Sequence, residues 1–110
     1  MKNSTAPNPP KGLSAEAKRL WRLLLEEYAI EDAGGLAVLS TGLEAFDRMR
    51  LAQKAIAKDG MTVTDRFGQA KAHPLLTVER DSRAQWMAAL KALNLDLEPL
   101  HDRPGRPGGR

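Results

Sequence analysis

The chain has 110 residues, 42% hydrophobic and 28% charged, which suits one small domain because domains commonly contain about 100–150 residues. The absence of cysteine excludes disulfide scaffolds, zinc–thiolate sites and thiol nucleophiles, and two isolated histidines leave little for a metal site. No apolar run approaches the roughly 20 residues that span a bilayer, and residues 1–12 lack the apolar stretch of a signal peptide, so we expect a cytoplasmic protein without a membrane partner.

The formal net charge of +3 resides in the two ends of the chain, because residues 14–96 carry equal numbers of acidic and basic side chains. Residues 1–13 are predicted to form a flexible N-terminal arm, and residues 97–110 a flexible basic C-terminal tail, since proline, glycine and small polar residues cannot build a core. The tail is either a frayed terminus or a segment that contacts phosphate. Its arginines are Arg103, Arg106 and Arg110.

The first predicted helix begins after Ser14, which is a favourable N-cap. Its apolar positions recur at helical spacing, at Ala17, Leu20, Trp21, Leu24, Leu25 and Tyr28. We expect it to stop before Gly34 and Gly35, because paired glycines favour a helix terminus with positive φ.

A second helix is predicted from about Leu36 to Asp59, with Gly60 as its C-cap. Its apolar stripe has the three- and four-residue steps of a heptad repeat, with Gln53 in the seam: Leu36, Leu39, Leu43, Phe46, Met49 and Ile56. Such a stripe packs on another helix, either within the chain or in a second subunit.

Residues 61–72 favour a short β-hairpin, because residues 61–64 have high β-propensity and residues 65–68 begin with aspartate and end with glycine, as turns commonly do. An isolated hairpin is marginal in water, so this one must pack on a helix or pair with a neighbouring subunit. Pro74 suits the first position of a third helix over 74–94, and Asn94 can end it in the left-handed conformation. The predicted fold is mainly α, with three helices, a long central one, and a hairpin before the last.

The order of these features resembles the small subunit of phage DNA-packaging terminases over roughly residues 13–103. The features that carry the resemblance are a tryptophan-bearing first helix (residues 17–21), a long helix ending at residues 58–60, the hairpin of residues 62–68, His73-Pro74-Leu75, and a Leu93-Asn94-Leu95 exit followed by proline and arginines. Two positions depart from the pattern: Gly34-Gly35 stands where an acidic residue is expected before the long helix, and Asn94 where glycine is usual.

The resemblance implies a non-enzymatic subunit that forms a homo-oligomeric ring in the host cell cytoplasm. It further implies that the ring recognises double-stranded viral DNA at the packaging site and presents it to the terminase large subunit, which carries the ATPase and nuclease. An alternative from another class is a helical protein–protein adaptor that forms homo-oligomers without binding DNA.

Charge segregates if the first two helices pack antiparallel, with position i opposite roughly position 66 minus i. Acidic side chains then gather at the turn: Glu26, Glu27, Glu31 and Asp32. Basic side chains gather at the other end, and with the tail arginines they are our predicted DNA contacts: Lys18, Arg19, Arg48, Arg50, Lys54, Lys58, Arg103, Arg106 and Arg110. The alternative is that these are solvated side chains paired with carboxylates such as Asp47 and Asp59.

The other residues that could bind a ligand or catalyse a reaction are better explained by structural roles. Trp21 and Trp86 lie on apolar helix faces and are expected in the core or an interface, with base stacking as the alternative. His73 is expected to be structural. Glu79 and Asp81 alternate with arginines, which favours a solvated or subunit-bridging face over paired-carboxylate catalysis. No nucleotide-binding glycine motif occurs, and we predict no catalytic residue, metal or cofactor.

Overall fold

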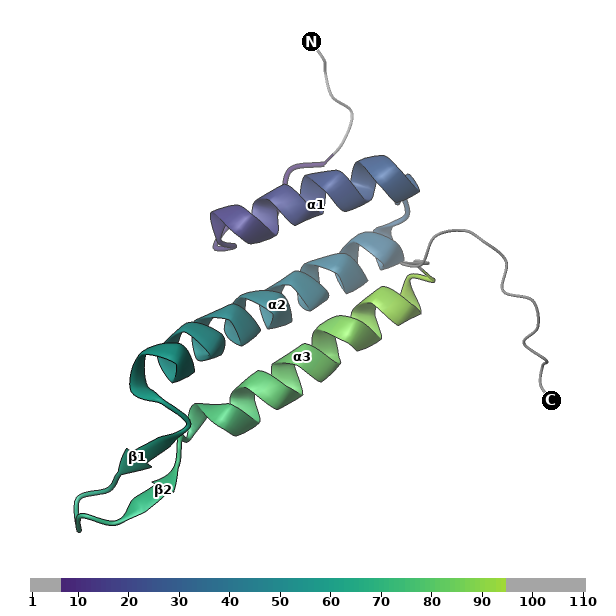
Figure 1. The fold of residues 1–110 in the computed structure, drawn as a ribbon. Helices are drawn as coiled ribbons and strands as arrows, with labels where there is room; N and C mark the ends of the chain where they lie inside the picture. The colour runs from purple at the N-terminus through teal and green to yellow at the C-terminus, as the bar shows by residue number, and fades with distance from the viewer. Residues whose placement is uncertain (1–6, 95–110) are drawn as a thin grey trace, which may run out of the picture.

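Residues 7–94 form three helices and one two-stranded antiparallel hairpin, which confirms the predicted fold class. A computed structural model describes residues 7–94 (Figure 1). The elements are α1 (Ala15–Tyr28), α2 (Ala33–Asp59), β1 (Thr62–Thr64), β2 (Ala70–Ala72) and α3 (Leu75–Ala92). Helix α2 lies between α1 and α3, and the hairpin extends beyond the end where α2 passes to α3. The predictions for residues 1–6 and for the tail of residues 97–110 concern positions outside the described residues.

The turn between α1 and α2 differs from the sequence prediction. Helix α1 starts as expected, with the Ser14 hydroxyl accepting a hydrogen bond from the Ala17 N–H at 3.0 Å. It ends at Tyr28, and Ala29 takes the left-handed conformation with φ 50°.

Gly34 and Gly35 lie in the first turn of α2, so the prediction that they separate the helices is wrong. Asp32 provides the reason, because its carboxylate accepts a hydrogen bond from the Gly35 N–H at 2.9 Å and caps α2 three residues earlier than expected. Asp32 also supplies an acidic residue directly before the long helix.

The hydrophobic core runs along α2, where the predicted stripe meets both neighbouring helices. Leu39 and Leu43 are fully buried, and the core continues into α1 through Trp21 and into α3 through Leu90. Trp86 packs edge-to-face on Phe46 with ring centroids 5.4 Å apart. Trp21 is therefore a core residue and Trp86 is partly buried against the core, both on apolar helix faces as expected, and α3 of the same chain covers much of the stripe.

Residues before α1 also contact the core. Leu13 is buried, and the Trp21 indole N–H donates to the Pro7 carbonyl at 3.1 Å. The segment from residue 7 to residue 13 is thus held against α1 at both of its ends, which extends the core beyond the first helical residue.

The hairpin has the register Thr62↔Ala72, Val63↔Lys71 and Thr64↔Ala70. Its loop is closed by Asp65, whose carboxylate accepts hydrogen bonds from the N–H groups of Phe67 and Gln69 at 2.8 and 2.9 Å. Asp65 therefore acts as a local loop cap, and the hairpin predicted over residues 61–72 is confirmed.

His73 joins the hairpin to both helices and has the structural role predicted for it. Its buried ring accepts a hydrogen bond at Nδ1 from the Leu75 N–H, so Nε2 carries the proton and donates to the Asp59 carboxylate, both at 3.0 Å. Its backbone N–H donates to the Met61 carbonyl at 2.8 Å. Helix α3 follows and ends at Ala92, with Asn94 at φ 60° as expected.

Candidate nucleic-acid interface

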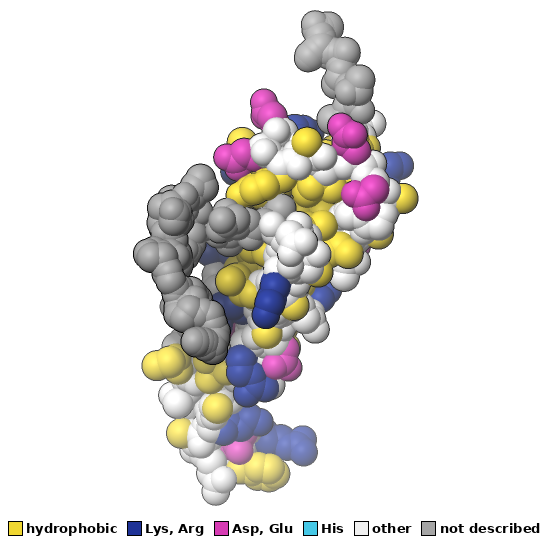
Figure 2. All heavy atoms as spheres, turned by 90° about the vertical axis from the view of Figure 1, so that its right-hand side faces the viewer, with side chains coloured by type: hydrophobic (Ala, Val, Ile, Leu, Met, Phe, Trp, Pro, Cys, Tyr) yellow, Lys and Arg dark blue, Asp and Glu magenta, His cyan; other side chains and the backbone are white. Residues whose placement is uncertain are grey.

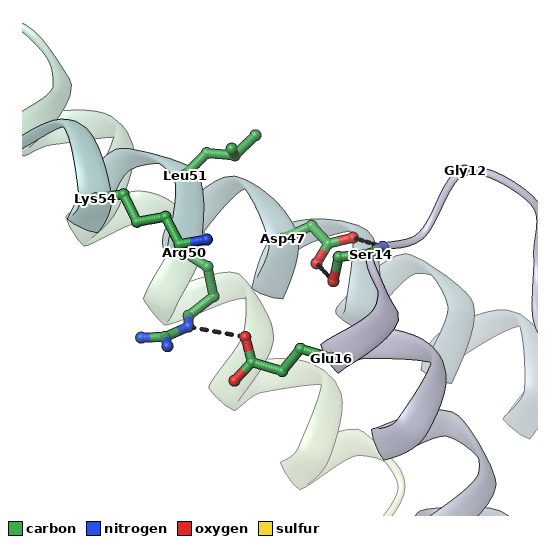
Figure 3. A pocket seen from close by; sticks show the side chains of 7 residues that line it. All are labelled: Gly12, Ser14, Glu16, Asp47, Arg50, Leu51 and Lys54. Atoms are coloured by element: carbon green, nitrogen blue, oxygen red, sulfur yellow. Dashed lines mark hydrogen bonds and ion pairs between the residues drawn. The ribbon is translucent and has the colours of Figure 1, made fainter.

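The predicted antiparallel pairing of α1 and α2 is confirmed by contacts between their side chains. Glu16 on α1 lies opposite Arg50 on α2, with Arg50 Nε 3.1 Å from Glu16 Oε1. Ser14 lies opposite Asp47, one turn earlier on α2. This pairing places the N-terminus of α1 beside the second half of α2, where the predicted basic cluster lies (Figure 3).

Asp47 binds the N-terminus of α1 rather than a lysine of α2. One carboxylate oxygen accepts from the Ser14 N–H at 2.8 Å and the other from the Ser14 hydroxyl at 2.6 Å. A carboxylate is favoured at this position because the first N–H groups of a helix carry partial positive charge. Asp47 is therefore not the counter-ion that the solvated alternative assigned to it.

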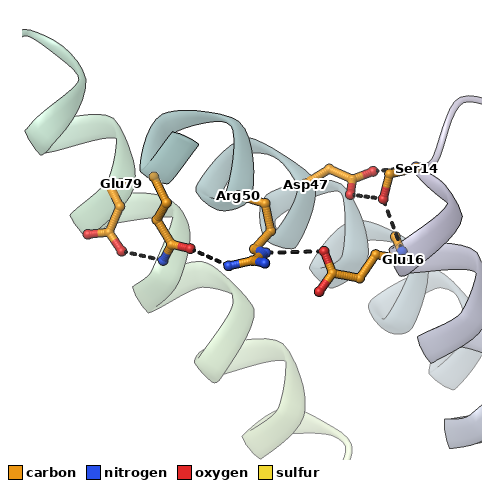
Figure 4. A network of polar contacts seen from close by, with 7 residues as sticks. Ser14, Glu16, Asp47, Arg50 and Glu79 are labelled. Carbon is orange, nitrogen blue, oxygen red and sulfur yellow. Dashed lines mark hydrogen bonds and ion pairs between the residues drawn. The ribbon is translucent and has the colours of Figure 1, made fainter. Parts of the chain in front are cut away.

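Arg50 belongs to a polar network that connects all three helices (Figure 4). Its Nε donates to Glu16, and its Nη1 donates to Gln53 Oε1 at 2.8 Å. The Gln53 amide in turn donates to Glu79 Oε2 on α3 at 2.9 Å. The glutamine in the apolar seam of α2 thus has a partner on each side, and the partly exposed Arg50 side chain is held by contacts within the protein.

Glu79 is the acidic end of this network. Hydrogen bonds from Arg83 and then from Gln53 stabilise its carboxylate and lower its pKa from an ordinary 4.5 to about 2. Two Arg83 nitrogens contribute, at 2.9 and 3.1 Å, one helical turn further along α3. The same pair raises the pKa of Arg83. Glu79 therefore works as a structural acceptor on a half-buried helix face.

A cavity of about 350 Å³ opens between the start of α1 and the second half of α2. Its lining consists of Gly12, Ser14, Glu16, Asp47, Arg50, Leu51 and Lys54 (Figure 3). Both of its carboxylates are engaged, Asp47 by Ser14 and Glu16 by Arg50. Among the described residues, Lys54 has no carboxylate partner, so it is the cation of this cavity that is open to an anionic ligand.

The structure places the other predicted contacts as follows. Lys58 is exposed in the last turn of α2, one turn beyond Lys54. Arg48 is exposed and donates to Gln85 of α3 at 2.9 Å. On α1, Arg19 is exposed and Lys18 is half-buried. Arg103, Arg106 and Arg110 lie outside the described residues.

The sequence analysis did not identify the exposed aromatic and basic side chains of the hairpin. Phe67 is 76% exposed at the loop, and the Arg66 guanidinium carbon lies 5.3 Å from the centre of its ring. Lys71 is exposed on β2. The sequence Arg66-Phe67 could have pointed to these side chains, because it places an aromatic residue beside a cation in a loop where the aromatic ring is not needed for the core.

The described basic residues can act on a ligand through electrostatic attraction. Within residues 7–94, no group of three or more His, Asp or Glu side chains is arranged to hold a metal ion. Over the same residues, no helix combines the length and apolar content that crossing a bilayer requires. Exposed lysines and arginines on rigid helices can contact the phosphates of a nucleic acid without reading its bases.

Comparison with known proteins identifies the family. Residues 15–98 match the family model described as phage terminase, small subunit, a span that runs from the start of α1 to beyond the end of α3. No curated protein and no solved structure matches the chain. Because the matched span covers most of the 110 residues, the chain belongs to the phage terminase small-subunit family, whose role is phage DNA packaging.

Proposed function

We propose that the chain assembles into a homo-oligomeric ring, binds double-stranded viral DNA at the packaging site, and recruits or regulates the large terminase subunit in the host cytoplasm. The family match over residues 15–98 is the observation that carries this proposal. Small terminase subunits are generally non-catalytic, so the ATPase and nuclease would belong to the large subunit. The mechanism is scaffolding, in which the ring positions DNA for the motor.

The proposed DNA contacts centre on the second half of α2. Lys54 and Lys58 are exposed one turn apart, and neither has a carboxylate partner among the described residues. Arg19 and Lys18 on α1, together with Arg48, complete the described part of the surface. A ring would repeat this surface in every subunit, so several weak phosphate contacts would act together.

Arg50 contributes less to this surface than its position on the helix suggests. Its guanidinium already donates to Glu16 and Gln53, so a phosphate contact would require it to leave one of them. We therefore assign Arg50 to the support of the α1–α2 packing and the larger phosphate contribution to Lys54 and Lys58. The tail arginines Arg103, Arg106 and Arg110 remain proposed contacts from the sequence.

DNA affinity measured against salt concentration tests the proposal. Each neutralised phosphate adds about 0.9 to the slope of log affinity against log salt, so Lys54→Gln/Lys58→Gln should lower the slope by up to about 2 per bound subunit. Lys91→Gln, an exposed lysine near the far end of α3, is the matched control and should leave the slope unchanged. A nearly flat slope for the parent protein would contradict DNA binding.

A mobility-shift assay at low and moderate salt separates this function from that of a protein–protein adaptor. The adaptor also predicts an oligomer, but no shifted DNA at either salt concentration. Deletion of residues 97–110 tests the tail, because unchanged binding of the large subunit and unchanged ATPase stimulation would refute recruitment through it.

A further inference from the structure

The hairpin arm, residues 61–72, is the least supported element of the fold. It extends away from the helices, and the hydrogen bonds that attach it lie at its base, from His73 N–H to Met61 and from the His73 ring to Asp59 (Figure 1). Phe67 is 76% exposed and Met61 68% exposed. A two-stranded hairpin alone is marginally stable in water, so these exposed apolar side chains suit a surface that another molecule covers.

The arm itself is basic, because residues 61–72 carry Arg66 and Lys71 against the single carboxylate of Asp65. Of the carboxylates near the arm, Glu79 is paired with Arg83 and Asp81 with Arg80. The carboxylates of Asp59 and Asp65 are held in place by the His73 ring and by loop N–H groups, and both keep their negative charge. Arg66 and Lys71 on the arm have no carboxylate partner among residues 7–94, and Lys58 at its base has none either. The arm therefore presents an apolar tip flanked by cations.

The opposite end of the molecule carries the complementary charge. Glu26 and Glu27 on α1 and Glu31 after it are exposed and contact no cation among the described residues, whereas Asp32 is used as the cap of α2. Leu23, one turn before Glu26 and Glu27 on α1, is 52% exposed. The basic residue of α1 nearest to these glutamates in sequence is Arg22, and Lys91 lies in the last turn of α3. Acidic side chains gather over the α1 end in Figure 2, and basic ones toward the hairpin.

We propose that the hairpin arm of one subunit docks on the acidic face of α1 in a second copy of the chain. Arg66 and Lys71 would lie against Glu26 and Glu27, and Phe67 against Leu23. The docked surfaces are different and lie at opposite ends of the molecule, so the contact is head-to-tail, the type that closes into a ring or extends into a filament. This inference rests on the proposed homo-oligomer and names the surfaces that build it.

Charge reversal on each side tests the contact. Arg66→Glu/Lys71→Glu and, separately, Glu26→Lys/Glu27→Lys should each weaken association of the subunits by about tenfold or more, because like charges then face each other. The four substitutions together should restore most of the association. The readout is the subunit count by native mass spectrometry and light scattering at matched protein concentration, without DNA. Rescue by the combined variant also excludes a folding defect.

Two further variants separate the arm from general effects of charge. Arg22→Glu/Lys91→Glu makes the same change in net charge at the acidic end and should leave association unchanged or strengthen it. Phe67→Ser should weaken association by about tenfold while the helical circular dichroism is unchanged, since the Phe67 ring contacts only Arg66 among the interactions described.

Four outcomes would overturn the inference. If the control reversal weakens association as much as the arm reversal, net charge rather than docking is responsible. If arm reversal leaves the subunit count unchanged but abolishes the DNA mobility shift, the arm contacts DNA instead. A parent protein that is monomeric at every concentration would refute the proposed homo-oligomer itself, whereas an oligomer that survives every arm variant refutes only this contact.

Discussion

Gly42 marks the closest approach of α2 and α3, and its replacement by alanine tests whether this approach is required. A Cβ added at Gly42 would lie 2.6 Å from the Ala89 Cβ and 3.3 Å from Trp86 Cε3. Optimal contacts between carbon atoms are about 3.5–4.0 Å, so α3 would have to move by about 1 Å at this point. Trp86 also packs on Phe46, and the displacement would reach the core.

The expected change in the free energy of unfolding of Gly42→Ala is the difference between two opposing effects. Alanine stabilises a helix interior by about 1 kcal/mol relative to glycine, whereas forcing a methyl group into a packed core destabilises by about 1–3 kcal/mol. Here the group it meets is a Cβ on another helix, which cannot rotate away, so the upper part of that range applies. We expect Gly42→Ala to lower the free energy of unfolding by about 1–2 kcal/mol and the Tm by about 5–10 °C.

Gly34→Ala is the matched control in the same helix. Its added Cβ would find its nearest atom, Asp32 Oδ2, at 3.6 Å, which is ordinary contact, so we expect a small increase in stability. Thermal and urea unfolding followed by circular dichroism at one protein concentration measure both variants. In the double variant Gly42→Ala/Ala89→Gly, the loss should be smaller than the sum of the two single losses. A Gly42→Ala protein as stable as the parent would refute the close packing.

The remaining predictions concern the Glu79 network and the Asp32 cap. The pKa of Glu79 is lowered from 4.5 to about 2, so its ion pair stabilises the fold above about pH 4.5 and loses this effect as the pH falls toward 2. Glu79→Gln should be less stable than the parent at neutral pH, and urea unfolding across this range should bring the two together in acid; a constant difference would contradict the assignment. Asp32→Ala should lower the free energy of unfolding by about 0.5–2 kcal/mol, because the Gly35 N–H loses its acceptor, with Glu31→Ala as a control that should have little effect.

The helices could be predicted from sequence because their signals are local and repetitive. Apolar side chains at steps of three and four defined the buried faces of α1 and α2, and Gly60 ended α2 as expected. The predicted boundary at Gly34-Gly35 was wrong because the low helix propensity of the glycines is opposed by the N-cap Asp32. The hydrogen bond from Gly35 to Asp32 holds the glycines in a helix that their own propensity disfavours.

The site could be predicted only in outline. The antiparallel pairing brought Glu16 and Arg50 together as the numbering required, but the involvement of Gln53 and Glu79 depends on how α3 packs on α2. Likewise, Asp47 lies three residues before Arg50, which is the spacing of a helical ion pair, yet Asp47 binds the N-terminus of α1. Which carboxylate meets which cation follows from helix packing, and a charge pattern along one helix does not contain that information.

The two proposals together explain how a domain with balanced charge could bind an anionic polymer. In an isolated subunit, the free carboxylates of Glu26, Glu27 and Glu31 would repel DNA while Lys54 and Lys58 attract it. Docking of the hairpin arm would place Arg66 and Lys71 of the neighbour against Glu26 and Glu27 and leave the lysines of α2 exposed. DNA affinity should therefore depend on assembly, and the arm reversal, which leaves Lys54 and Lys58 intact, should weaken DNA binding in proportion to the subunits it releases.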